Sequence, residues 1–186
     1  MILYIHGFGG SGEGQKARLL KQTLQKEGII APSLPTHPAL AIQTLRELIE
    51  RFSRHEPVGL IGSSLGGFYA LHLLQFFESM RVVVINPSIN PDVTLRRAIG
   101  PVGGTNFYDG SHYEWNEAHI EALKTLRPTV YRTENLLLLT QLGDELLDAN
   151  EAIEALKGCE QVIEEGGDHS FSGLERHIDR IRGFLR

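Results

Sequence analysis

The segment Gly62-Ser63-Ser64-Leu65-Gly66 decides the fold, because it places the pattern G-x-S-x-G at the junction of two kinds of sequence. Before it, residues 58–62 form a short apolar run that is typical of a buried strand. After it, residues 65–78 are unusually apolar and long enough for a helix. A serine on a sharp turn between a strand and a helix is typical of a nucleophile elbow.

Two serines occupy this turn, and the glycines indicate which of them is the nucleophile. The flanking turns of an elbow approach so closely that side chains two residues before and after the serine would clash. Ser64 has glycine at both positions, whereas Ser63 has Ile61 and Leu65. The sequence therefore predicts Ser64 as the nucleophile. The alternative is a small-residue turn that only lets the helix pack tightly on the strand.

Short strand-like runs and longer segments of helical period alternate along most of the chain. Near-continuous apolar strands separated by helices are typical of a parallel sheet covered on both faces. We therefore predict one compact α/β domain, residues 1–186, with about six mostly parallel strands. The expected strands are 2–6, 29–34, 58–62, 81–86, 136–141 and 161–164, and the expected helices are 15–27, 38–52, 65–78, 117–126, 148–156 and 172–185.

Residues 87–133 interrupt this alternation with a glycine-rich stretch, 100–104, and then a group of aromatic residues. An insertion of this length in an α/β domain usually has a functional role, often as a lid over the active site. We therefore predict a lid or cap insertion after the strand at 81–86. The aromatic residues could line a substrate entrance or form the insertion's own small core; they are Phe107, Tyr108, Tyr113 and Trp115.

A serine hydroxyl needs a base to remove its proton, and His169 is the histidine best placed to supply it. It lies in the turn 165–171, between the last predicted strand and the last predicted helix. Loops at the carboxyl ends of parallel strands converge on one crevice, where His169 could reach Ser64. The alternative is a solvated loop histidine.

The base in turn needs a carboxylate that fixes its tautomer and stabilises its charged form. Asp144 follows the predicted strand 136–141, and the order Ser64, Asp144, His169 is the one that accompanies this elbow. Asp168 adjoins His169 and is poorly placed to fold back onto its ring. Asp144 could also be a turn-forming residue after a glycine, and the competing carboxylates are Asp148, Glu145 and Asp92.

The oxyanion that forms during acyl transfer must be met by two backbone N–H groups. One is expected from Leu65, which follows the nucleophile. The other is expected from the glycine-rich loop after the first strand, with Phe8 as the candidate. Gly7 and Gly9 would let this backbone approach the substrate, and the Phe8 side chain could form a wall of the acyl pocket.

The same loop also reads as G-x-G-x-x-G, which is the pattern of a dinucleotide-binding turn. That reading requires an acidic residue about 20 positions later, at the end of the second strand, to hold the ribose. Residues 30–36 contain no acidic residue. A phosphate-binding P-loop fails as well, because Gln15 stands where a lysine is required.

The composition excludes several classes of protein. The chain has 186 residues, 41% of them hydrophobic, and its net charge of −5 predicts no basic face for nucleic acid or an anionic membrane. Residues 1–7 do not form a targeting signal, and no apolar run approaches the roughly 20 residues of a membrane helix, so we expect a cytoplasmic protein. Cys159 is the one cysteine, so neither an intrachain disulfide nor a Cys-based zinc site can form, and no other metal site is predicted.

Taken together, four segments look like those of an α/β-hydrolase. More narrowly, the chain resembles the small bacterial YqiA-like esterases of the UPF0227 type over essentially its whole length. The segments are His6–Ser11, Ile61–Gly67, Gly143–Asp148 and Glu164–Phe171.

The resemblance implies that Ser64, Asp144 and His169 form a catalytic triad, with Phe8 and Leu65 as oxyanion donors. It also implies hydrolysis of small-molecule acyl esters or thioesters without a cofactor. The two leading antiparallel strands of a standard hydrolase are expected to be missing. That would leave a sheet edge that a second copy could cover in a homodimer.

Two other classes of function remain open. A non-catalytic binding module on a hydrolase scaffold would keep the fold but misplace the triad or block the oxyanion site. A C–C hydrolase, peptidase or perhydrolase would share the triad and differ in its pocket.

Overall fold

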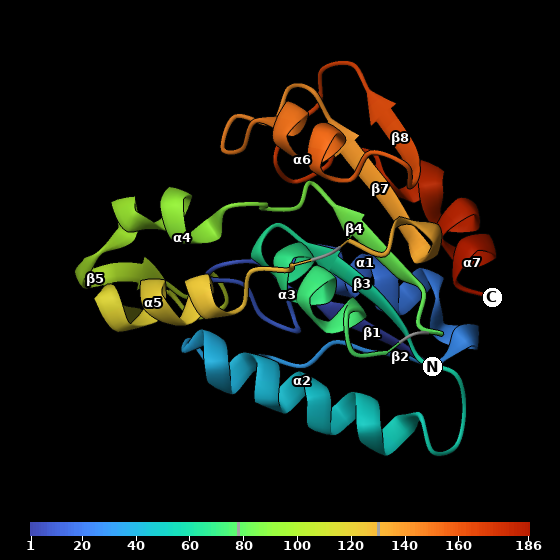
Figure 1. Cartoon of the computed structure of the whole chain (residues 1–186), viewed down its shortest axis with the longest axis horizontal. Helices are drawn as coiled ribbons and strands as arrows, with labels where there is room; N and C mark the ends of the chain where they lie inside the picture. The colour runs from blue at the N-terminus through green and yellow to red at the C-terminus, as the bar shows by residue number, and fades with distance from the viewer. Residues whose placement is uncertain (78, 130) are drawn as a thin grey trace.

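The protein is described by a computed structural model that covers residues 1–77, 79–129 and 131–186 (Figure 1). A six-stranded sheet with the order β2-β1-β3-β4-β7-β8 forms its centre, and every neighbouring pair of strands is parallel. The predicted α/β class and the parallel sheet are thus confirmed. The strands are β1 (Ile2–Ile5), β2 (Ile29–Ile30), β3 (Gly59–Ser63), β4 (Val82–Ile85), β7 (Leu136–Gln141) and β8 (Glu160–Glu164).

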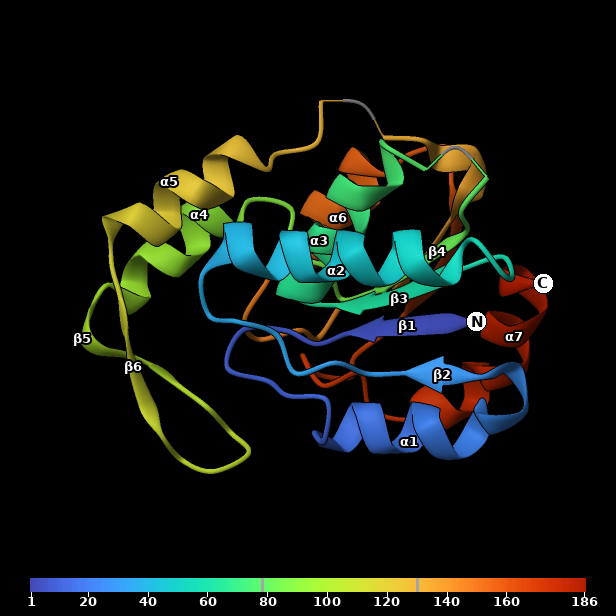
Figure 2. The ribbon, with the colours of Figure 1, turned by 90° about the horizontal axis from the view of Figure 1, so that it is seen from below.

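Helices cover both faces of this sheet, as Figure 2 shows with α1 and α7 on one side and α2 and α3 on the other. Successive strand residues point to opposite faces. In β4, Val82 and Val84 therefore join the core under α2 and α3, while Val83 and Ile85 join the core under α1 and α7. The main helices are α1 (Gln15–Thr23), α2 (Pro38–Phe52), α3 (Leu65–Leu74), α6 (Ala149–Ala155) and α7 (Ile178–Leu185).

The largest difference from the predicted elements concerns the second strand, which is only two residues long rather than 29–34. Pro32 and Pro35 have no N–H to donate to a strand partner, so the ladder cannot continue past them. The N–H of Leu34 instead donates to Nε2 of His6, at 3.0 Å. The chain therefore stays beside β1 without pairing to it.

Three predicted helices are shorter than expected. The first gives way to a 3-10 turn at Gln25–Glu27, and the last begins with a 3-10 turn at Leu174–His177, after Gly173 at φ 82°. A residue with positive φ cannot belong to a right-handed helix, so no helix runs through Gly173, and α7 follows the 3-10 turn at Ile178. Helix α3 ends at Leu74, and the predicted end at Glu78 lies outside the described residues.

The segment 87–133, in which position 130 lies outside the described residues, contains α5 (Glu117–Thr125), as the sequence predicts. It also contains elements that the sequence pattern did not reveal. Two strands pair antiparallel within it, and glycine occupies half of the first one. A Cβ on Gly104 would lie 2.0 Å from the ring of Tyr113, so the glycine makes room for that ring. The elements are α4 (Pro91–Thr94), a 3-10 turn (Leu95–Ala98), β5 (Gly100–Thr105) and β6 (His112–Trp115).

Candidate active site

Ser64 lies on the tight turn between β3 and α3, and its backbone is held in an unusual conformation (φ 55°, ψ −122°). Its N–H donates to the carbonyl of Ile85, and its own carbonyl accepts from the N–H of Ser88. A Cβ on Gly62 would lie 2.3 Å from the carbonyl oxygen of Gly66, and one on Gly66 would lie 2.1 Å from that of Ile5. Glycine is therefore required on both sides of Ser64, as the elbow pattern predicts.

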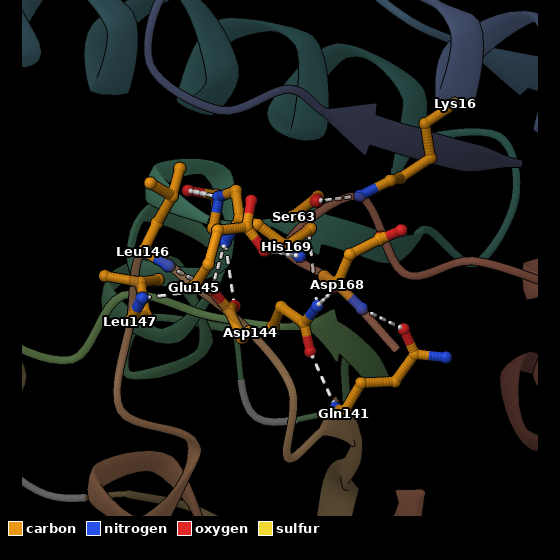
Figure 3. Close-up of polar contacts among 11 residues, drawn as sticks. Lys16, Ser63, Gln141, Asp144, Glu145, Leu146, Leu147, Asp168 and His169 are labelled. Carbon is orange, nitrogen blue, oxygen red and sulfur yellow. Dashed lines mark hydrogen bonds and ion pairs between the residues drawn. The ribbon is translucent and has the colours of Figure 1, made fainter. Parts of the chain in front are cut away.

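The structure brings together the three side chains that the sequence singles out. His169 Nε2 lies 3.0 Å from Ser64 Oγ, and His169 Nδ1 lies 2.8 Å from Asp144 Oδ2. Figure 3 shows the ring of His169 directed at the Asp144 carboxylate. An acceptor at Nδ1 fixes the proton on that nitrogen, which leaves Nε2 free to accept the serine proton.

Asp144 is buried and is suited to remain charged there. Burial raises the pKa of this carboxyl, but the hydrogen bonds from His169 and from the backbone of Leu146 and Leu147 outweigh burial and hold the pKa below its usual range. The two backbone N–H groups donate to Oδ1 at 2.9 and 3.0 Å. The carboxylate is therefore anchored on its own loop as well as on the histidine.

The three competing carboxylates, and Asp168 as well, have other hydrogen-bond partners. Asp148 accepts from Asn150 at the start of α6, and Asp92 forms an ion pair with Arg127 at 2.8 Å. Glu145 accepts from the backbone N–H of His169 rather than from its ring, and Asp168 accepts from the hydroxyl of Ser172. Asp144 is thus the carboxylate placed against the ring.

Two buried amide side chains, which sequence reasoning missed, hold the histidine loop in place. Asn86, directly after β4, donates to the carbonyls of Asp168 and His169 at 2.9 and 3.2 Å and accepts from the N–H of Gln141 at 3.0 Å. The side chain of Gln141 accepts from the N–H of Asp168 and donates to Glu164. A polar residue that ends a run of apolar strand residues is the signal that could have identified both.

The glycine-rich loop after β1 passes directly over Ser64. A Cβ on Gly7 would lie 3.0 Å from Cβ of Ser64, so the loop backbone and the nucleophile are in contact. Leu65 is the first residue of α3, which means that its N–H has no partner within the helix. The Phe8 ring packs edge-on against Trp115, with 4.9 Å between ring centroids.

His6 holds the start of this loop. Its Nε2 accepts from Leu34, so Nδ1 carries the proton and donates to the carbonyl of Gly7 at 2.9 Å. Burial lowers the pKa of His6, and the bond to Gly7 only partly offsets this, which favours the neutral ring that both hydrogen bonds require.

The glycines of the G-x-G-x-x-G pattern have packing roles in this loop. Gly9 has φ +67°, and its carbonyl accepts from the N–H of Phe107 at 2.8 Å. A Cβ on Gly12 would lie 2.0 Å from the carbonyl oxygen of Ala31. Close backbone approach therefore accounts for these glycines without a nucleotide.

Two pockets meet at Ser64 and His169. The smaller, of about 160 Å³, is largely apolar and is lined by Phe8, Leu95, Leu146 and Leu147 among others. The larger, of about 770 Å³, has a mixed polar and apolar lining that includes Gly7 and Lys16. The third predicted substrate-binding residue of this loop, Gly9, lines a separate cavity of about 60 Å³ that does not include Ser64.

The aromatic residues of the segment 87–133 lie in different surroundings, and none of them forms a separate core of the segment. Trp115 is fully buried and belongs to the core, and Tyr113 packs beside it. Phe107 is 77% exposed, and it lines both pockets at Ser64. Tyr108 is exposed and lines neither of them.

Within the part of the chain that the structure describes, no three His, Cys, Asp or Glu side chains are grouped so that they could hold a metal ion. Among the same residues, no helix has both the length and the apolar character needed to cross a membrane.

Solved structures share this fold at low sequence identity. A protein from Agrobacterium vitis superposes with a TM-score of 0.79 at 18% identity, over 100% of this chain and 87% of that one. Alpha/beta hydrolase domain-containing protein 10 from mouse gives 0.75 at 14%, over 99% and 88%. The esterase domain of a Rhodothermus marinus protein gives 0.72 at 20%, over 98% and 85%. The fold is therefore that of the α/β-hydrolases.

Curated relatives match along almost the entire chain. A UPF0227 protein from Serratia proteamaculans is 26% identical over 189 residues, and UPF0227 protein PC1_2487 from Pectobacterium carotovorum is 23% identical over 193. Both alignments cover 99% of this chain and 98% of the relative. The model of the uncharacterised protein family UPF0227 matches residues 1–186. The chain therefore belongs to the UPF0227 family, as its sequence motifs predict.

Proposed function

We propose that this protein is a serine hydrolase that cleaves carboxylic esters or acyl thioesters through an acyl-enzyme. The hydrogen-bonded series Ser64–His169–Asp144 carries the proposal, because it provides a nucleophile, a base and a group that orients the base. The esterase domain among the proteins of similar fold supports the reaction class.

In the proposed reaction, Ser64 Oγ attacks the acyl carbonyl while His169 Nε2 takes the hydroxyl proton. The backbone N–H groups of Phe8 and Leu65 stabilise the oxyanion of the tetrahedral intermediate. His169 then gives its proton to the leaving alkoxide or thiolate, and the acyl group stays on Ser64. Water, deprotonated by His169, attacks the acyl-enzyme, and the carboxylic acid leaves as the serine regains its proton.

All groups used in this reaction come from the chain itself, so the proposed mechanism requires no metal or cofactor. The substrate is a small molecule whose carbonyl can reach the junction of the two pockets. A cytoplasmic location and a homodimer belong to the same proposal as expectations from the sequence.

The decisive test is covalent labelling of the activated serine. The protein is treated with a fluorophosphonate, its intact mass is measured, and the modified peptide is mapped. We expect one adduct on Ser64, which Ser64→Ala abolishes and Ser63→Ala retains. A chain-length series of esters and thioesters then measures turnover by the labelled site.

The other outcomes point to the other classes of function. A protein that folds but gives no adduct would contradict an activated serine and favour a binding module. An adduct on Ser64 together with no turnover of esters or thioesters would favour another hydrolase-fold reaction, such as C–C cleavage, peptide cleavage or perhydrolysis.

A further inference from the structure

Lys16 lies beside the proposed nucleophile, although the proposed reaction does not use it. It belongs to α1, and its Nζ donates to Oγ of Ser63, the neighbour of Ser64, at 2.6 Å (Figure 3). Lys16 also lines the larger of the two pockets that contain Ser64 and His169. Its ammonium group therefore lies within the space open to a substrate.

This ammonium group is poorly satisfied by the protein. An ammonium has three N–H donors, and in the described part of the chain only the Ser63 hydroxyl accepts from Lys16. Lys21 on the same helix, by contrast, forms an ion pair with Glu13 at the surface. Burial lowers the pKa of Lys16 to about 8, although Asp144 and Asp168 act in the opposite direction, so the group is still mostly charged at pH 7.

The nearby carboxylates do not replace Lys16 as the contact that a ligand would make. Asp168 also lines this pocket, but one of its oxygens accepts from Ser172, and the other is buried with no hydrogen-bond partner among the described residues. Glu175, the remaining acidic residue of the lining, is exposed at the surface. Among the described residues that line the larger pocket, Lys16 is therefore the Lys or Arg side chain positioned to bind a substrate group.

The second pocket indicates which part of the substrate Lys16 would meet. That pocket is small and mostly apolar, with Leu95, Leu146 and Leu147 in its lining and Arg97 exposed at the surface, which suits a short apolar acyl chain. The leaving group is then directed to the larger pocket, which Lys16 lines. We propose that Lys16 determines specificity by binding an anionic group, a carboxylate or phosphate, on the alcohol or thiol part of the substrate.

This proposal rests on the proposed ester hydrolysis, and it can be tested with two matched substrates. These are the butanoate esters of 4-hydroxybenzoate, which is anionic, and of 4-hydroxybenzamide, its neutral counterpart. We expect wild type to favour the anionic ester by about tenfold in kcat/KM, as one charge-assisted hydrogen bond allows. Lys16→Met should bring the ratio of the two esters close to one, and the control Lys21→Met should keep the wild-type ratio.

A binding measurement separates this proposal from the reaction. Calorimetry on Ser64→Ala measures the affinity for each intact ester, and the double variant with Lys16→Met repeats it. Tighter binding of the anionic ester that disappears with Lys16→Met supports the site even if no ester is hydrolysed. Equal affinity for both esters, or a preference that survives Lys16→Met, would overturn it. So would a preference confined to esters that carry the charge on the acyl group, such as 4-nitrophenyl hemisuccinate.

Discussion

The carboxyl edge of the main sheet and the β5–β6 hairpin both border Ser64, but they are held in different ways. At the sheet edge, Asn86 and Gln141 each bond to two or more neighbouring segments, so the histidine loop is fixed from several directions. The hairpin meets the site through the N–H of Phe107, which donates to the Gly9 carbonyl, through a hydrogen bond between Tyr113 and the Gly9 backbone, and through ring contacts to Phe8. Phe107 and Tyr108, in the turn that connects its two strands, are exposed.

This difference assigns separate tasks to the two regions. Groups that exchange protons must keep their spacing within a few tenths of an ångström, which the buried amide network at the sheet edge provides. In a region with fewer fixed contacts, side chains can be substituted without disturbing that spacing. We therefore expect changes at the sheet edge to lower kcat, and changes in the hairpin to alter stability or KM.

The largest effect is expected at the carboxylate. Asp144→Asn removes the charge that stabilises protonated His169 and allows the wrong tautomer, so kcat should fall by roughly 10³- to 10⁴-fold. Steady-state kinetics on a short-chain ester measures this loss. Asp148→Asn is the matched control, because asparagine can replace aspartate as the cap of α6. If Asp148→Asn were the more damaging change, Asp148 rather than Asp144 would be the acid.

A smaller effect, of about tenfold, is expected from pH on the charge preference that Lys16 produces. Because burial lowers its pKa to about 8, Lys16 is charged below that pH and neutral above it. The preference for the anionic ester should therefore be present at pH 6 to 7 and disappear as the pH rises through 8. The ratio of the two kcat/KM values is measured at each pH, since this parameter reports the free enzyme. A ratio unchanged up to pH 10 would show that Lys16 keeps its proton or does not contact the charge.

In the hairpin, the fit between Gly104 and Tyr113 can be tested by adding a single methyl group. Gly104→Ala forces the Tyr113 ring to move and should lower the free energy of unfolding by about 1–3 kcal/mol. Urea denaturation followed by circular dichroism measures the loss. Gly100→Ala, in the same strand, meets open space and should change stability by less than about 0.5 kcal/mol. Equal losses of stability from both changes would mean that these glycines are needed for their backbone conformation and not for the space beside the Tyr113 ring.

The smallest effect is expected from Phe107→Ala. This side chain is mostly exposed, so the free energy of unfolding should change by no more than about 0.5 kcal/mol. Its ring lines both pockets, so KM for a short-chain ester should rise several-fold while kcat changes less. Tyr108→Ala, next in sequence and outside both pockets, serves as the control. Equal effects from the two would contradict an entrance role for Phe107 and weaken the prediction of a lid at 87–133.

The sequence singled out Ser64, Asp144 and His169 because each sits at a junction that local rules describe, and the structure places the ring of His169 within hydrogen-bond distance of the other two side chains. An elbow needs glycine on both sides of its serine, and the residues after parallel strands share one edge. The supporting network was not predictable in this way. Asn86 ends a valine-rich strand, which marks it as unusual, but its hydrogen-bond partners lie 55 and more residues away, so no local pattern reveals which groups it binds.

The hairpin was missed for a related reason. Glycine is depleted in strands, and residues 100–105 contain three glycines, so the strand propensity of this stretch is low and favours a loop. The tertiary contact with Tyr113 reverses that preference. The short second strand shows the opposite case, because apolar residues at 29–34 favour a strand that the prolines cut short.

The order of the elements along the chain has a consequence for synthesis on the ribosome. The strands β1 to β4 and the elbow with Ser64 come first, whereas Asp144 and His169 belong to loops that follow β7 and β8. Chains emerge from the amino end, and domains fold as their segments become available. A nascent chain therefore carries its serine without a base until β8 and α7 have left the exit tunnel. In the proposed mechanism, the Ser64 hydroxyl is activated only after these later segments have folded onto the sheet.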